Sequence, residues 1–137
     1  MADTSHVGRR YTAEGQVVDA EGAARFAAAV AGNDPVPAEL GEVPPTFAAV
    51  YCLFPTLGQI FLDPEVKIRL EGMVHGEQEF TWHHPVSRGD VVDAAATIAG
   101  VEEKRGRLYI TVELEATRPG GGEKVLSGRA LLLVSAT

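Results

Sequence analysis

The stretch "TFAAVYCLFPTLGQIFL", Thr46 to Leu62, contains no charged residue. As a helix with a rise of about 1.5 Å per residue it would extend roughly 26 Å, less than the ~30 Å hydrocarbon core of a bilayer. It also contains Pro55, Gly58 and Gln59, and no positively charged segment flanks it. A helix that is apolar on every side in a small protein must be surrounded by protein. The stretch therefore predicts a buried central helix and not a membrane span.

The composition of the chain is that of an ordinary globular protein. Its 137 residues, 45% hydrophobic and 23% charged, predict a single domain over residues 1–137. The net charge of -7 and the lack of a Lys/Arg cluster argue against a nucleic-acid partner. Cys52 is the only cysteine, which excludes an intramolecular disulfide, and its apolar surroundings predict a core residue. The segment "MADTSHVGRR" has no apolar region typical of a secretory signal, so we expect a cytoplasmic protein.

Local signals define the elements that precede the central helix. A short strand is expected at about Tyr11–Val18. Asp19 is placed to cap a helix over Ala20–Ala31, and Gly32 is a plausible end of that helix. Within the central helix, Pro55 lacks the N–H that an α-helix needs and is expected to kink or divide it.

The C-terminal half changes from a helical period to a period of two. In "RLYITVELEAT", apolar residues alternate with polar ones, as in a strand with one buried face. We expect an antiparallel meander of four strands, at Val74–His84, Val91–Glu103, Arg107–Thr117 and Lys124–Ser135. A sheet of this kind can bury an uncharged helix by curling around it. The predicted fold is therefore α+β, a single hot-dog domain whose exposed edges favour pairing with a second protomer.

The stretch "VHGEQEFTWHHPVSRGD", Val74 to Asp90, raises the possibility of a metal site because it contains three histidines. As a regular strand it would place His75 and Glu77 on one face, opposite Gln78 and Trp82. At ~3.3 Å per residue, His75 and His83 lie roughly 26 Å apart and cannot share an ion. Two ligands do not make a zinc site, so no metal is predicted, and no G-x-G-x-x-G follows a strand to hold a nicotinamide or flavin.

Three strings in this order, "FAAAVAGNDP", "VPPTF" and "HGEQEFTWHHPVSRGD", resemble the N-terminal-type dehydratase domain of the MaoC-like hot-dog family. The resemblance extends from about Gly8 to Val134. It implies (R)-specific hydration or dehydration of 3-hydroxyacyl thioesters in fatty-acid or polyketide metabolism. The acyl group would be carried on the phosphopantetheine of CoA or of an acyl carrier protein, and the protein would need no cofactor of its own.

The family's acid–base motif, G-D-x-N-P-x-H, is degenerate in this chain. Asn33 stands at the position of the motif's Asp, Pro37 stands where its His is expected, and the segment is one residue short. Asp34 is a nearby carboxylate with a shifted position. Pro44 and Pro45 occupy the place of the His-Gly that opens the central helix and supplies a backbone N–H to the thioester carbonyl. The resemblance therefore implies a chain without its own Asp/His dyad.

In this family a deficient domain often pairs with a competent hot-dog domain and contributes interface and part of the acyl tunnel. The resemblance thus implies a dehydratase subunit, in a homodimer or in a heterodimer with a competent subunit. Thr46, Phe47 and the loop Asn33 to Pro37 would then lie near the acyl thioester. A core position for Phe47 and a helix-capping role for Thr46 are equally good interpretations.

Two other functions remain open on the sequence. One is a self-sufficient homodimeric hydratase or thioesterase that uses unconventional residues such as Asp34, Glu39, His75 or His84. Thioesterase chemistry is disfavoured because residues 46–62 contain no carboxylate, and Asp63, the nearest, is better explained as a helix-ending Asp-Pro. The other is a module that binds an acyl thioester without chemistry.

Overall fold

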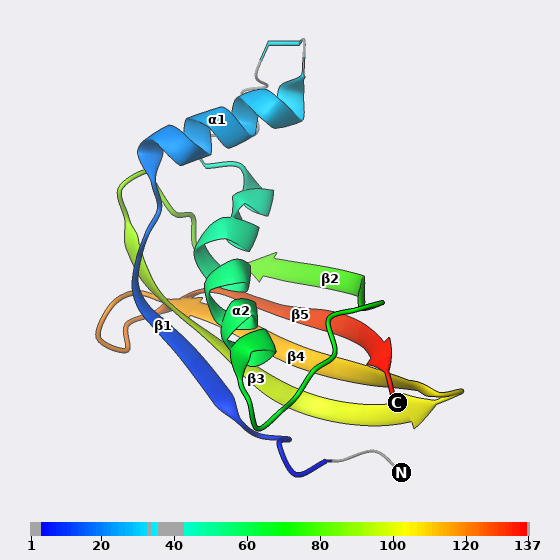
Figure 1. Cartoon of the computed structure of the whole chain (residues 1–137). Helices are drawn as coiled ribbons and strands as arrows, with labels where there is room; N and C mark the ends of the chain where they lie inside the picture. The colour runs from blue at the N-terminus through cyan, green and yellow to red at the C-terminus, as the bar shows by residue number, and fades with distance from the viewer. Residues whose placement is uncertain (1–3, 33, 36–42, 137) are drawn as a thin grey trace.

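In the computed structural model, five antiparallel strands curve around one side of a central helix (Figure 1). The structure describes residues 4–32, 34–35 and 43–136. The elements are β1 (Arg10–Val17), α1 (Ala20–Ala31), the 3₁₀ turn η2 (Pro45–Phe47), the π-helical segment η3 (Ala49–Leu53), α2 (Phe54–Leu62), β2 (Val74–Trp82), β3 (Val91–Lys104), β4 (Arg107–Thr117) and β5 (Lys124–Ser135). Together, η2, η3 and α2 form the central helix. The predicted α+β hot-dog fold is confirmed.

The first helix begins and ends where its capping residues predict. The Asp19 carboxylate accepts a hydrogen bond from the Gly22 N–H at 2.7 Å, which satisfies one of the unpaired donors of the first turn. Gly32 follows the last helical residue with φ 65°, a conformation that favours glycine. Its N–H donates to the Ala28 carbonyl at 3.0 Å. Helix α1 thus has the predicted bounds.

The central helix changes type along its length because of Pro55. The π-helical segment η3 lies directly before α2, in which Pro55 occupies the first turn. A proline cannot donate to the preceding turn, and a wider π turn accommodates the lost hydrogen bond. The buried Thr56 hydroxyl donates to the carbonyls of Cys52 at 2.8 Å and Leu53 at 3.1 Å. The predicted disturbance at Pro55 is therefore a change of helix type within one continuous helix.

The order of the strands differs from the predicted meander. The sheet runs β1-β3-β4-β5-β2, so only β3, β4 and β5 form a meander. Strand β2 was expected beside β3, but it pairs with β5 at the far edge. The reason is that β1 already pairs with β3, with Tyr11 opposite Ala96. The chain must therefore pass from β2 at one edge of the sheet, beyond β5 and β4, to β3 over residues 83–90.

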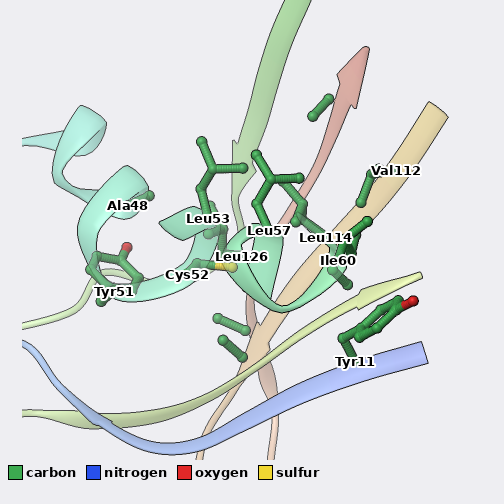
Figure 2. Packing of buried hydrophobic residues seen from close by; sticks show 14 of the residues in the cluster. Tyr11, Ala48, Tyr51, Cys52, Leu53, Leu57, Ile60, Val112, Leu114 and Leu126 are labelled. Carbon is green, nitrogen blue, oxygen red and sulfur yellow. The ribbon is translucent and has the colours of Figure 1, made fainter. Parts of the chain in front are cut away.

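The core lies between the central helix and the concave face of the sheet. Figure 2 shows Tyr51, Cys52, Leu53, Leu57 and Ile60 of the helix near Val112, Leu114 and Leu126 of the sheet, and all of these side chains are buried. The opposite side of the helix is open, contrary to the expectation that protein surrounds it on every side. Val50 is 41% exposed, Phe54 62% and Leu62 82%. The sheet of one chain thus covers only part of its uncharged helix.

The segment Pro45–Leu62 is long and apolar enough to cross a membrane by composition, with a mean hydropathy of 1.4. However, its sheet-facing side chains belong to the hydrophobic core of the domain. A helix that packs in the core of a domain can have the same composition, and the buried face of this helix packs against the sheet.

Candidate functional site

A groove of about 330 Å³ opens at the start of the central helix. One wall is the entrance of the helix and the other is the end of β2 with the loop that follows it. The lining residues are Val43, Pro44, Pro45, Tyr51, Trp82, His83, His84, Pro85 and Val86. The groove therefore combines apolar walls with two imidazoles, at the end of the helix where the family resemblance places the thioester.

The entrance of the helix offers few backbone donors. Pro45 is the first residue of η2 and has no N–H, and Phe47 donates its N–H to the Pro44 carbonyl at 2.9 Å. Thr46 is the first residue of the helix that has an N–H. Pro44, and not Thr46, occupies the capping position and makes no side-chain capping bond, so the capping role considered for Thr46 is wrong.

The side chain of Phe47 belongs to the core. It is 3% exposed, and its ring lies 5.3 Å from that of Phe26 in an edge-on arrangement and 6.3 Å from that of Tyr51. This is the packing role that the sequence left open beside substrate binding. Thr46 is exposed, and neither residue is among those that line the groove. Contact of Thr46 and Phe47 with substrate stays a prediction.

Strand β5 holds the two histidines of the groove in place. The backbone N–H groups of His83 and His84 both donate to the Val125 carbonyl, at 2.8 and 3.3 Å. The His83 Nε2 lies 2.9 Å from the Ser127 hydroxyl, and the His84 Nε2 lies 3.4 Å from the Glu123 carboxylate. Imidazole and carboxylate side chains are the groups that most often serve in general acid–base catalysis. His84 thus lines the groove and contacts a carboxylate, although Glu123 itself is not among the lining residues.

The "PVSRGD" segment has a structural role, because Asp90 closes the loop that carries the histidines. Its carboxylate accepts the Ser87 N–H at 2.8 Å and an Arg118 N–H at 3.0 Å, and these two donors lower its pKa against the effect of burial. Arg118 also donates to the Pro85 carbonyl in the groove wall at 3.0 Å. Sequence reasoning missed Arg118, which precedes a glycine-rich turn and gives no signal of its own.

The degenerate motif is only partly visible. Asn33 and Pro37 lie outside the described residues, as does Glu39. Asp34 is exposed, and its N–H donates to the Ala31 carbonyl at 3.2 Å. It does not line the groove. The structure therefore does not bring Asp34 to the two histidines.

His75 lies on the face of β2 opposite to the one predicted. A register shift between His75 and Glu77 marks a bulge at Gly76, so the regular alternation is broken there. His75 consequently shares a face with Gln78, and its Nε2 lies 3.0 Å from the Gln78 Oε1. The predicted pairing of His75 with Glu77 on one face is wrong.

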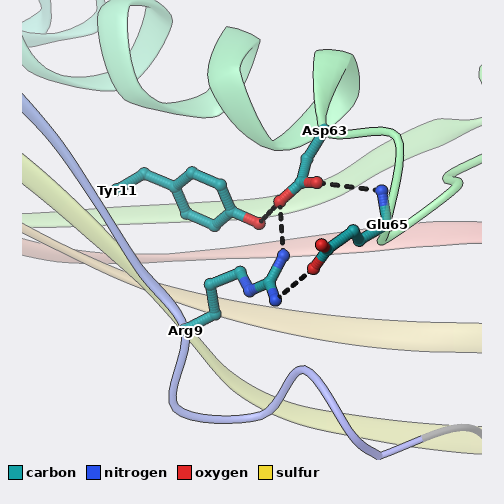
Figure 3. A network of polar contacts seen from close by, with 4 residues as sticks. All are labelled: Arg9, Tyr11, Asp63 and Glu65. Atoms are coloured by element: carbon teal, nitrogen blue, oxygen red, sulfur yellow. Dashed lines mark hydrogen bonds and ion pairs between the residues drawn. The ribbon is translucent and has the colours of Figure 1, made fainter.

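Asp63, the carboxylate nearest to the central helix, accepts hydrogen bonds on both of its oxygens (Figure 3). It accepts hydrogen bonds from the Tyr11 hydroxyl at 2.6 Å, Arg9 at 2.9 Å and the Glu65 N–H at 2.9 Å. These donors, Tyr11 first, lower the pKa of Asp63 to about 2. Burial, with the Asp63 hydrogen bond, raises the pKa of Tyr11 to about 12. Asp63 ends α2 as predicted and is a poor general base, because a carboxylate with so low a pKa binds a proton weakly and its oxygens already accept three hydrogen bonds.

The Cys52 thiol is a core group without reactive character. Its Sγ lies 3.5 Å from the Glu115 carbonyl oxygen, and burial raises its pKa to about 12. Among the residues that the structure describes, no group of three or more His, Cys, Asp or Glu side chains could hold a metal ion.

Comparison with known proteins identifies a family for this chain. The family model described as "FAS1-like, dehydratase domain region" matches residues 5–126. A UPF0336 protein of Cutibacterium acnes is 38% identical over 126 residues, covering 88% of this chain and 87% of the relative. A UPF0336 protein of Thermobifida fusca is 33% identical over 91 residues, 66% of this chain. That match spans 59% of the Thermobifida protein, so the chain covers about three fifths of some relatives.

Solved structures share the fold over nearly the whole chain. One is the crystal structure of a C-terminally truncated HadBC (3R-hydroxyacyl-ACP dehydratase) complex from Mycobacterium tuberculosis. The alignment with that structure has a TM-score of 0.76 and 25% sequence identity. It covers 96% of this chain and 99% of the solved chain. Another is the (R)-hydratase of A. caviae involved in PHA biosynthesis, with a TM-score of 0.57 and 21% identity over 96% of this chain and 98% of that one. The second likeness concerns the fold alone.

Proposed function

This chain belongs to the FAS1-like dehydratase-domain family, within the MaoC-like hot-dog dehydratases, and we propose that it is one subunit of an (R)-specific 3-hydroxyacyl-thioester dehydratase. In this proposal it lacks the Asp/His dyad and supplies interface and part of the acyl tunnel. A second hot-dog subunit supplies the acid and the base.

One observation carries the proposal, namely the residues that replace the dyad. Dehydration must remove a weakly acidic C–H and protonate a poor leaving group, so it needs two titratable side chains in hydrogen-bond reach. At the motif position of the base this chain has Pro37, which can neither give nor take a proton. The entrance of the helix supports the same conclusion, because Pro45 has no N–H to offer a thioester carbonyl.

The groove at the helix entrance fits a contributing role. Its walls, which include Pro44, Tyr51, Trp82 and Val86, are largely apolar and would suit an acyl chain or the pantetheine arm. The 3R-hydroxyacyl-ACP dehydratase neighbour is described as a HadBC complex, and a complex of two chains is the arrangement that we propose for this one. The thioester would come from CoA or an acyl carrier protein, and no further cofactor is proposed. We expect the complex to work in the cytoplasm, in fatty-acid or polyketide metabolism.

The test is hydration of crotonyl-CoA and of a longer trans-2-enoyl-CoA, followed as loss of the enoyl absorbance. The purified chain alone should show no rate above the uncatalysed one. A competent (R)-hydratase in the same assay is the positive control for each substrate. The complex of the chain with a hot-dog subunit that has an intact Asp and His should be active. Hydration by the isolated chain at a rate comparable to that of the control enzyme would refute the proposal.

A second candidate function is a self-sufficient homodimeric hydratase, and the contact of the groove residue His84 with Glu123 favours it. If the isolated chain shows activity, the variants H84A and D34N distinguish the possible bases. Loss of activity in H84A but not in D34N would identify the groove pair as the source of catalysis. Loss in D34N alone would point to the shifted carboxylate of the degenerate motif.

A further inference from the structure

A small cavity of about 80 Å³ lies beyond the C-terminal end of the central helix. It is formed between residues 66–69, which follow α2, and the strands β3, β4 and β5. The groove lies at the other end of the helix, and the two share no lining residue. The central helix, Pro45–Leu62, separates them by roughly 25 Å at a rise of ~1.5 Å per residue (Figure 1). The cavity is therefore distinct from the groove.

The interior of the cavity is apolar. Three strands contribute five aliphatic side chains from the concave face of the sheet, namely Ile98, Val101, Leu108, Ile110 and Val134. Two more, Val66 and Ile68, come from the segment after α2. In a regular strand Ile98 and Val101 would lie on opposite faces, but a register shift between Ile98 and Gly100 marks a bulge, and both line the cavity. Such an interior offers a water molecule few hydrogen-bond partners and suits a small apolar group.

The mouth of the cavity is positively charged. Lys67 and Arg69, which are both exposed, line it together with the half-buried His6. Among the described residues, no Asp or Glu lines the cavity, although the whole chain has a net charge of -7. The mouth therefore favours an anionic group, whereas the interior favours an alkyl group.

The backbone holds Lys67 at the mouth. Its φ is 55°, in the left-handed region that is uncommon for residues other than glycine, and its N–H donates to the Asp63 carbonyl at 3.3 Å. Arg9 binds the carboxylates of Asp63 and Glu65 at 2.9 and 2.6 Å (Figure 3). None of the ion pairs between described residues includes Lys67. Arg9 thus occupies the two acidic side chains of this turn, and the Lys67 ammonium is left for an anion.

From these features we infer that the cavity is a binding site for a short-chain carboxylate, with its alkyl tail among the aliphatic side chains and its carboxylate beside Lys67 and Arg69. At roughly 30 Å³ for each carbon group, similar to a water molecule in the liquid, the cavity holds about three carbons beyond the carboxylate. Butanoate has this size and charge. A longer tail would extend into solvent, which distinguishes this site from a tunnel for long acyl chains. The site needs neither a dyad nor a partner subunit, so the inference goes beyond the proposed dehydratase role.

A titration of the whole chain, labelled with ¹⁵N, tests this through the chemical shifts of its amide groups. Acetate, butanoate and hexanoate are added separately at neutral pH and constant ionic strength. Butanoate should cause saturable shifts at residues 66–69 and around Val101, Leu108 and Val134. Its dissociation constant should lie at least about tenfold below that of acetate, because each buried methylene strengthens binding about fourfold. Hexanoate should bind at most about twofold more tightly than butanoate, because its last carbons find no further apolar surface.

Two variants and one further probe separate the effect of the cation from that of the cavity. K67Q removes the charge and should weaken butanoate binding about two- to fivefold, the range expected for an exposed ion pair. The matched control K124Q removes an exposed lysine that does not line the cavity, and it should bind butanoate as wild type does. V101F places a ring in the cavity and should abolish binding. Propylammonium, which has the same tail and the opposite charge, should not bind.

The inference is overturned if butanoate gives no saturable shift, or if acetate or propylammonium binds as tightly as butanoate. It is equally overturned if K124Q weakens binding as much as K67Q, or if folded V101F binds butanoate as wild type does. Affinity that rises by the full methylene increment from butanoate to hexanoate would indicate an open tunnel and would also overturn it. Unchanged amide shifts away from the cavity establish that each variant is folded. Because the readout is binding to the isolated chain, failure here is distinct from failure of the dehydratase proposal, which is judged by hydration rate.

Discussion

The substitution Gly128→Ala should loosen β2 from the sheet, because no side chain fits at this position. A Cβ added to Gly128 would lie 2.6 Å from the backbone oxygen of Glu79 and 2.8 Å from Cδ1 of Phe80. The first contact is with backbone on the neighbouring strand, so rotation of a side chain cannot relieve it. Overpacking of this kind costs about 1–3 kcal/mol. Replacing glycine in a strand otherwise favours folding by about 0.5–1 kcal/mol, which offsets part of the clash.

Gly100→Ala is the matched control, because Gly100 is also in a strand and its added Cβ would meet nothing within 4 Å. The backbone-entropy gain is common to both variants, so their difference isolates the clash. In urea unfolding we expect G128A to be less stable than G100A by about 1–3 kcal/mol. Hydrogen exchange should rise in β2 before it rises in β3 and β4. Equal stability of the two variants would refute the reasoning, since the predicted contact would then be absent.

Three further predictions concern single groups. The pKa of Asp63 is lowered from 3.8 to about 2, so its stabilising effect is present above pH 3.8 and is lost as the pH falls toward 2. The Tm of D63N should therefore lie below that of wild type at neutral pH, and the gap should close over this range in a thermal melt. The Cys52 thiol, with a pKa near 12, should not react with a disulfide reagent at mildly alkaline pH until guanidinium chloride unfolds the chain. Gly89, at φ 88°, should tolerate alanine poorly, with a loss of about 1–2 kcal/mol in urea unfolding, whereas helical Gly58→Ala should not destabilise the fold.

The elements of this fold could be predicted because their signals are local. Asp19 and Gly32 mark the ends of α1 through groups within a few residues, and the alternation in β4 reports one buried face. The strand order could not be obtained in this way. Whether β3 neighbours β1 or β2 depends on how the chain crosses the sheet, and no residue of the connection 83–90 specifies the crossing locally.

The groove lies at the helix entrance, but none of the predicted site residues Thr46, Phe47 and Asp34 lines it. The residues at the helix entrance follow from the sequence, whereas the side of β2 on which His75 lies depends on a bulge. That bulge lies at Gly76, where an added Cβ would lie 2.8 Å from Cδ1 of Leu133 on the next strand. The role of Arg118 arises from a contact with Asp90 at a separation of 28 residues, which no period of two or 3.6 reveals.

The open side of the central helix connects the fold to the proposed role. Phe54 and Leu62 are 62% and 82% exposed, and full burial of such a side chain is worth about 1.5–3 kcal/mol. In the isolated chain these apolar side chains stay exposed to solvent, so the chain does not gain that free energy of burial. A subunit that covers the helix would recover it, and binding to the folded state alone would raise the stability of the chain with partner concentration. In the proposed role the chain lacks its own dyad and would need such a partner for chemistry, so the same contact would meet both requirements.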